Sequence, residues 1–148
     1  MSTQQVVEGL DETFRQAQKV YRGYLAAALA LVAVCVIFQV TGVMEQAVWE
    51  DPLGPILGVA LGVVGVLGAV YMSVVARINA RRQPATPAVL LTGLILRLAG
   101  MEAIAVYGVI IGMLWRPDVG IAFAVVGGLG VLVSGPRRRD WENYLRRA

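Results

Sequence analysis

The residues most able to do chemistry lie in the segment RLAGMEAIAVYGVII, from Arg97 to Ile111, where a glutamate interrupts an apolar run. Glu102 lies near the middle of residues 88–114, a stretch long enough to cross a bilayer as a helix. A charged carboxylate at that depth costs at least about 2.5 kcal/mol, which favours its neutral, protonated form. Such a group typically carries a proton or an ion, or makes a polar contact that fixes helix packing.

Arg97 is the candidate structural charge partner of Glu102. It lies five residues earlier, so the two side chains differ by about 140° around a helix and by about 7.5 Å along it. A direct pair on one helix face needs a spacing of three or four residues. Arg97 is therefore expected to extend toward the cytoplasmic interface, or to pair with Glu102 of a neighbouring copy. A proton carrier and a structural charge pair both remain open.

The chemistry that surrounds Glu102 is sparse. Cations other than a proton need several oxygen ligands, and only the hydroxyl of Tyr107 is close in sequence. We expect any ion at Glu102 to be a proton. The chain has no histidine, which excludes His-based metal sites and a Ser-His-Asp triad. We predict no metal, no cofactor and no enzymatic activity, because no nucleophile–base pair or phosphate loop is present.

The elements that position these residues are apolar helices. The chain has 148 residues, of which 57% are hydrophobic and 16% charged, with a mean hydropathy of +0.68. This composition is typical of an all-α polytopic membrane protein. We expect one bundle over residues 1–148, with four spans at residues 24–43, 53–76, 88–114 and 118–134. The fourth span is short.

The positive charges predict the topology. Eleven of the thirteen basic residues lie before the first span, between the second and third spans, or after the fourth. The positive-inside rule places both termini and the central loop in the cytoplasm, which indicates a bacterial inner (plasma) membrane protein. The same bias explains the net charge of +3 without a nucleic-acid partner. The expected partners are the lipid bilayer and either other copies of the chain or the subunits of a membrane complex.

Amphipathic segments flank the bundle. Apolar residues three and four apart, from Val7 to Tyr21, predict a helix that lies in the interface or packs on a partner. The basic tail that follows Gly135 is expected to lie on the cytoplasmic surface. Three of its residues are expected to anchor it in the interface: Trp141, Tyr144 and Leu145.

The second span carries a stripe of small residues, which provides close helix packing in a bilayer. Its members are Gly54, Gly58, Gly62 and Gly65. If the second and third spans fold about Arg82 and Gln83, Glu102 lies level with residue 63, between Gly62 and Gly65. We therefore predict that this stripe packs the second and third spans closely, and that Gly62→Leu disrupts the hairpin more than Gly120→Leu in the fourth span.

A glycine-rich helix, a polar loop and a second helix with a central glutamate resemble the hairpin of the rotary ATP synthase c subunit over residues 54–114. The segment MEAIAVYG is similar to the family's sequence around its ion-carrying carboxylate. The resemblance implies that Glu102 carries a proton and that Tyr107 is a hydrogen-bonding neighbour. It also implies a cytoplasmic loop that faces the soluble part of the rotor, formed by Arg82, Gln83 and Pro84.

The whole-chain layout adds a span on each side of this hairpin and places Arg97 on its second helix. In this it is similar to small uncharacterised four-helix bacterial membrane proteins. The leading hypothesis is a non-enzymatic four-helix membrane protein that acts through helix packing or partner binding, with a hairpin that carries a buried carboxylate. The alternative is a proton-translocating proteolipid related to the c subunit, with Glu102 as the carrier.

Overall fold

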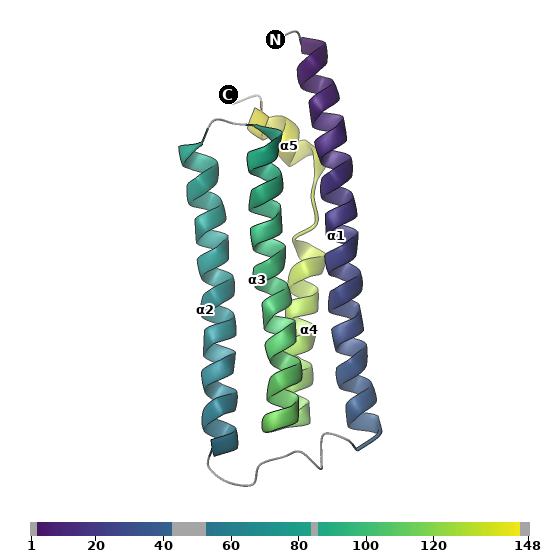
Figure 1. The fold of residues 1–148 in the computed structure, drawn as a ribbon, viewed down its shortest axis with the longest axis vertical. Helices are drawn as coiled ribbons and strands as arrows, with labels where there is room; N and C mark the ends of the chain where they lie inside the picture. The colour runs from purple at the N-terminus through teal and green to yellow at the C-terminus, as the bar shows by residue number, and fades with distance from the viewer. Residues whose placement is uncertain (1–2, 43–52, 84–85, 146–148) are drawn as a thin grey trace.

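The computed structural model describes residues 3–42, 53–83 and 86–145, and these residues form helices without any strand. The four long helices are α1 (Thr3–Val40), α2 (Leu53–Arg82), α3 (Pro87–Leu114) and α4 (Pro117–Val133). A short helix, α5 (Arg138–Leu145), lies across one end of the bundle (Figure 1). The all-α prediction is confirmed for the described part of the chain.

Three of these helices, α1, α2 and α3, are long and apolar enough to cross a membrane. Helix α4 has 17 residues and passes the same test only together with α5, from which it is bent by 59°. The fold is therefore consistent with a membrane protein of three spans, or four if the bent pair forms one span.

Local sequence explains where α3 and α4 begin and end. Thr86 caps α3, since its hydroxyl accepts a hydrogen bond of 3.4 Å from the Val89 amide, and proline occupies the first turn. Helix α4 also begins with proline, followed by Asp118 in its first turn, where the helix dipole favours an anion. It ends at Val133 and is followed by Ser134, whose hydroxyl donates a 2.7 Å hydrogen bond to the Gly130 carbonyl, and then by a Gly-Pro pair.

Helix α3 is the central element, because it packs against α1, α2 and α4, whereas α2 packs mainly against α3 (Figure 1). The N-terminal end of α1, the turn from α2 to α3, and α5 all lie at the same end of the bundle (Figure 1). The cytoplasmic placement of both termini and the central loop stays a prediction.

The register of α2 against α3 differs from the prediction. A Cβ added to Gly100 would lie 3.0 Å from Cα of Ala69, and one added to Gly65 would lie 2.8 Å from the ring of Tyr107. Glu102, which follows Gly100 and precedes Tyr107, is therefore level with a position between Ala69 and Gly65, and the prediction that Gly62 and Gly65 flank it was wrong. The reason is the turn: α2 continues to Arg82 and α3 begins only at residue 87, so the centre of the turn lies beyond Gln83.

The closest helix contact lies between α3 and α4. A Cβ added to Gly120 would lie 2.5 Å from Cα of Gly112 and 2.6 Å from the carbonyl oxygen of Gly108. At Gly62 of α2, the nearest atom is Cζ of the Phe123 ring, at 2.9 Å. This geometry favours Gly120 over Gly62 as the more sensitive position, opposite to the sequence prediction, because α3 and α4 both contribute glycines and their backbones meet directly.

The apolar residues of the N-terminal segment, predicted from Val7 to Tyr21, pack against another part of the same chain. Helix α1 continues unbroken for 38 residues, and its buried Leu10 belongs to the same apolar cluster as Trp141 of α5. Asp11 forms an ion pair with Arg138, with 3.0 Å between the Asp11 Oδ1 and the Arg138 Nη2. The prediction that the apolar stripe lies in the interface or on a partner was wrong for this segment, since the stripe packs against α5 of the same chain. The side chain of Val7 lies outside the described part.

The C-terminal tail is likewise packed on the protein. Trp141 is only 5% exposed, and the hydroxyl of Tyr144 donates a 2.7 Å hydrogen bond to the Ala80 carbonyl near the end of α2. The prediction that these two side chains anchor the tail in the lipid interface was wrong, because the Trp141 ring is buried within the bundle and the Tyr144 hydroxyl bonds to its backbone. The side chain of Leu145 lies outside the described part.

Candidate functional site

Glu102 extends from α3 into an open hollow beside α1. The hollow has a volume of about 340 Å³, and its other lining residues all come from α1: Val20, Gly23, Tyr24 and Ala27. Two of these residues are small, which leaves room for the carboxylate. Helices α1 and α2 pack on different sides of α3, so the face of α3 between them stays uncovered in the described structure.

The carboxylate is half-buried, and none of the polar or charged side chains of the described residues is fully buried. The prediction of a buried carboxylate was therefore wrong. The turn from α2 to α3 directs the small-residue face of α2 toward Tyr107 and Gly100, while Glu102 lies on a different side of α3. Because the hollow is open, the Glu102 carboxylate is accessible from outside the bundle.

Arg97 lies on another side of α3, next to the end of α4 and to α5. Its Nε donates a 3.3 Å hydrogen bond to the carbonyl of Gly93, so the side chain turns back toward the α2–α3 turn. Glu102 takes part in none of the ion pairs found among the described residues, which join Arg116 to Asp118 and Arg138 to Asp11 and Glu142. The two side chains therefore do not meet within one chain, as their five-residue spacing predicts.

Tyr107 is also separated from Glu102. Its ring packs over Gly65 of α2, whereas Glu102 faces α1. Because these residues are also five apart, they differ by about 140° around the helix. The structure does not bring together the two residues that the c-subunit resemblance assigns to one proton site.

The stripe on α2 is buried along its whole length and receives aromatic rings. Gly58 faces Trp115, Gly62 faces Phe123 and Gly65 faces Tyr107, while Gly54 is also buried. Because they have no side chains, Gly58, Gly62 and Gly65 leave room for these aromatic rings beside α2. At the other end of α2, Arg82 and Gln83 are exposed; Pro84 lies outside the described residues.

Sequence reasoning missed the glycines that bring α3 and α4 together. A Cβ added to Gly108 would lie 2.6 Å from the amide nitrogen of Ala124, and one added to Gly127 would lie 2.5 Å from that of Ala105. The signal was present as two small-xxx-small pairs, one in each helix. They are Gly108 with Gly112, and Gly120 with Ala124.

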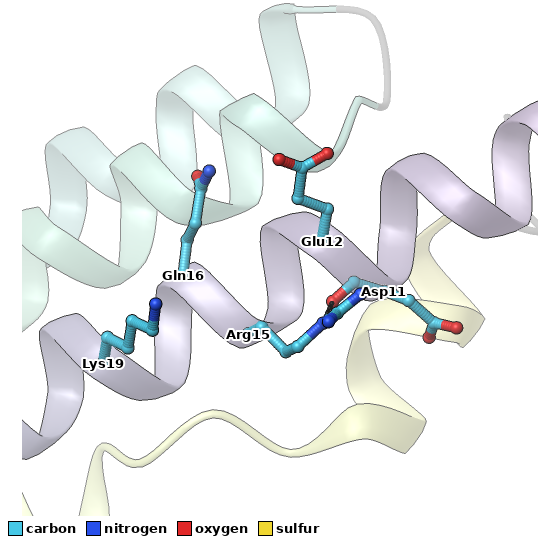
Figure 2. Close-up of a pocket in the computed structure, with 5 residues that line it drawn as sticks. All are labelled: Asp11, Glu12, Arg15, Gln16 and Lys19. Carbon is cyan, nitrogen blue, oxygen red and sulfur yellow. Dashed lines mark hydrogen bonds between the residues drawn. The ribbon is translucent and has the colours of Figure 1, made fainter.

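Another hollow, with a volume of about 470 Å³, is lined only by polar residues of one helix (Figure 2). All five of its lining residues come from α1: Asp11, Glu12, Arg15, Gln16 and Lys19. In Figure 2 these side chains extend outward from the helix, and Nε of Arg15 donates a 3.4 Å hydrogen bond to the Asp11 carbonyl. We interpret this region as a solvated helix face.

Among the described residues, no group of three or more His, Cys, Asp or Glu side chains is placed to hold a metal ion. Cys35 is buried in α1 with a free thiol and packs beside Ala124 of α4. Glu102 with its hollow on α1 is therefore the candidate site. Comparison with protein-family models, with curated proteins and with solved structures finds no match to this chain.

Proposed function

We propose that this chain is a non-enzymatic integral membrane protein of four spans, with both termini and the α2–α3 turn on the cytoplasmic side of a bacterial plasma membrane. The length and apolarity of α1, α2 and α3 support the spans. The orientation rests on the basic residues, eleven of which precede α1's apolar half, flank the α2–α3 turn or follow α4.

We further propose that the protein acts by binding a partner helix within the bilayer, through the uncovered face of α3 that carries Glu102. The observation that supports this is a half-buried carboxyl group in an open hollow, without an ion-pair partner in the described part of the chain. A carboxyl group that faces lipid leaves its hydrogen-bonding capacity unsatisfied. A partner that supplies a donor at this depth would remove that cost.

The partner we propose is a different membrane protein. In a second copy, Arg97 is the cation nearest in depth to Glu102, but its side chain turns away toward Gly93. Its guanidinium group therefore points toward the cytoplasmic end of α3, away from the level of Glu102. A polar or basic side chain from another subunit fits the hollow on α1 better.

Site-specific photocrosslinking in cells tests this proposal. A photoreactive residue at Ala103, beside Glu102, should give a discrete crosslinked product that is lost in the Glu102→Leu background. The control is the same residue at Val70, which is 55% exposed on α2 and should give only diffuse lipid adducts. Identical patterns from both positions, or a product unaffected by Glu102→Leu, would contradict partner binding at this face.

The second candidate is proton carriage by Glu102, as in a proteolipid related to the rotary ATP synthase c subunit. The observation that favours it is the same open hollow, since a carboxyl group that carries protons must exchange them with a pathway outside the bundle. Against it, Tyr107 lies on another side of α3 and offers no hydrogen bond to the carboxylate. We therefore rank proton carriage below partner binding.

A further inference from the structure

The early end of α4 creates two adjoining hollows at the cytoplasmic end of the proposed membrane protein. Helix α4 stops at Val133, well short of the end of the bundle where α3 begins, and the chain then rises to α5 (Figure 1). One hollow, of about 450 Å³, is bounded by α1, and the other, of about 300 Å³, by α3 and α5. They share the residues of the bend: Val133, Gly135, Pro136 and Arg137.

Arginines from three parts of the chain line these hollows. Arg22 of α1 lines the first, Arg97 of α3 lines the second, and Arg137 lines both. The one acidic lining residue is Asp140, in the second hollow. None of these three arginines takes part in the ion pairs found among the described residues, so their guanidinium groups can donate to an anion.

The carbonyls near the end of α4 are partly occupied by donors from the protein itself. The last carbonyls of α4 already accept hydrogen bonds: Gly130 from the Ser134 hydroxyl at 2.7 Å, and Leu132 from the Tyr21 hydroxyl at 3.1 Å. The Ser134 amide also donates to the Val131 carbonyl, at 3.2 Å. Besides the Nε of Arg97, which donates to the Gly93 carbonyl, the guanidinium groups that line the two hollows offer donors to an anion.

The second hollow also has an apolar wall, in which Leu90 of α3 and Val133 of α4 are the accessible side chains, while Leu94 and Trp141, which also line it, are buried. Guanidinium groups beside an apolar wall match a phosphate group that is joined to hydrocarbon. We infer that the α4–α5 bend binds the phosphate headgroup of an anionic phospholipid, with the upper part of an acyl chain against this wall. Soluble phosphate shares the headgroup chemistry, but it would leave the apolar wall unused.

The inference rests on the proposed membrane orientation but does not depend on Glu102. It is tested by native mass spectrometry of the detergent-purified protein, titrated with phosphatidylglycerol or with phosphatidylcholine. Arg97→Gln combined with Arg137→Gln should lower phosphatidylglycerol retention about tenfold or more, because charge-assisted hydrogen bonds are lost. The matched control combines Arg77→Gln with Arg139→Gln, which removes the same charge at exposed positions outside both hollows and should leave retention within about twofold if binding is local.

Three results would overturn the inference: equal retention of the two lipids by the unchanged protein, equal losses in the two double variants, or displacement of the lipid by glycerol phosphate at matched concentration. The last would indicate a site for soluble phosphate. Because the double variant could fold poorly, Arg137→Gln alone provides a second measure in the exposed link between α4 and α5. It should lower retention about threefold or more, whereas Arg139→Gln should not. Carbonate extraction of cell membranes tests the underlying membrane assignment separately.

Discussion

The ring of Phe14 in α1 meets the indole of Trp141 in α5 edge to face, with centroids 5.5 Å apart and an interplanar angle of 82°. The contact joins residues from opposite ends of the chain. It fixes the C-terminal helix across the end of the bundle, where Tyr144 also bonds to the Ala80 carbonyl of α2. Helix α5 therefore connects α1 and α2, which pack mainly on different sides of α3.

A double-mutant cycle measures this aromatic contact. Phe14→Leu and Trp141→Leu should each lower the free energy of unfolding in detergent, with a coupling of about 0.5–1.5 kcal/mol between them. The control cycle pairs Trp141→Leu with Phe38→Leu, near the other end of α1, which should be additive. Additivity in the first cycle would show that the rings do not meet in solution.

Glycine substitutions compare the α3–α4 contact at Gly120 with the contact of α2 on Phe123 of α4 at Gly62. Gly120→Ala should lower the free energy of unfolding by about 2 kcal/mol or more, since its Cβ meets backbone atoms that cannot move independently. Gly62→Ala should cost less, because the ring of Phe123 can shift. Gly68→Ala is the control, since a Cβ there has no neighbour within 4 Å among the described residues. A greater loss for Gly62→Ala than for Gly120→Ala would contradict the observed α3–α4 packing.

The separation of Arg97 from Glu102 predicts the stability of their variants. Because the two do not pair within the chain, Glu102→Gln should change the free energy of unfolding of the isolated protein by less than about 0.5 kcal/mol. Combining Arg97→Leu with Glu102→Leu should show no coupling. A loss of several kcal/mol for Glu102→Gln, rescued in the double variant, would instead indicate a charge pair.

Carbodiimide labelling distinguishes proton carriage from partner binding. A protonated carboxyl group that exchanges protons within the membrane should react near neutral pH, and Glu102→Gln should abolish both the labelling and any proton flux into proteoliposomes. Under the partner-binding proposal, proteoliposomes of the unchanged protein show no flux above empty vesicles. Labelling accompanied by flux that depends on Glu102 would replace the first proposal with the second.

Cysteine labelling tests the orientation. Cys35 is replaced by serine, and single cysteines are then placed at Gln83, in the α2–α3 turn, or at Asp118, at the opposite end of the bundle. A membrane-impermeant reagent added to intact cells should label the cysteine at position 118 but not that at position 83. The opposite pattern would invert the topology and move the proposed lipid site to the outer leaflet.

The sequence predicts individual helices better than their contacts. Prolines and a threonine cap mark the starts of α3 and α4, so their bounds agree with the predicted spans to within a residue or two. The spacing of Arg97 and Glu102 likewise predicts their separation, since helix periodicity alone determines it. Each of these features depends on residues that are close together in sequence.

The contacts between helices depend on features that the residue pattern within a single helix does not contain. The register of α2 on α3 follows from how much chain the turn uses after Arg82. Whether Glu102 faces α1 or α2 follows from which helices flank α3. Small-xxx-small pairs occur in α2, α3 and α4 alike, so the pattern could not show that Gly120 meets backbone while Gly62 meets the side chain of Phe123.

The central place of α3 has a consequence for biogenesis. Under the proposed membrane assignment, when a nascent chain has delivered only α1 and α2 to the membrane, these two helices have little surface to share, since α2 packs mainly against α3. Lateral association must then wait until the segment from Pro87 to Leu114 has entered the bilayer. A ribosome that stalls before that segment would leave two independent helices exposed to membrane quality-control proteases.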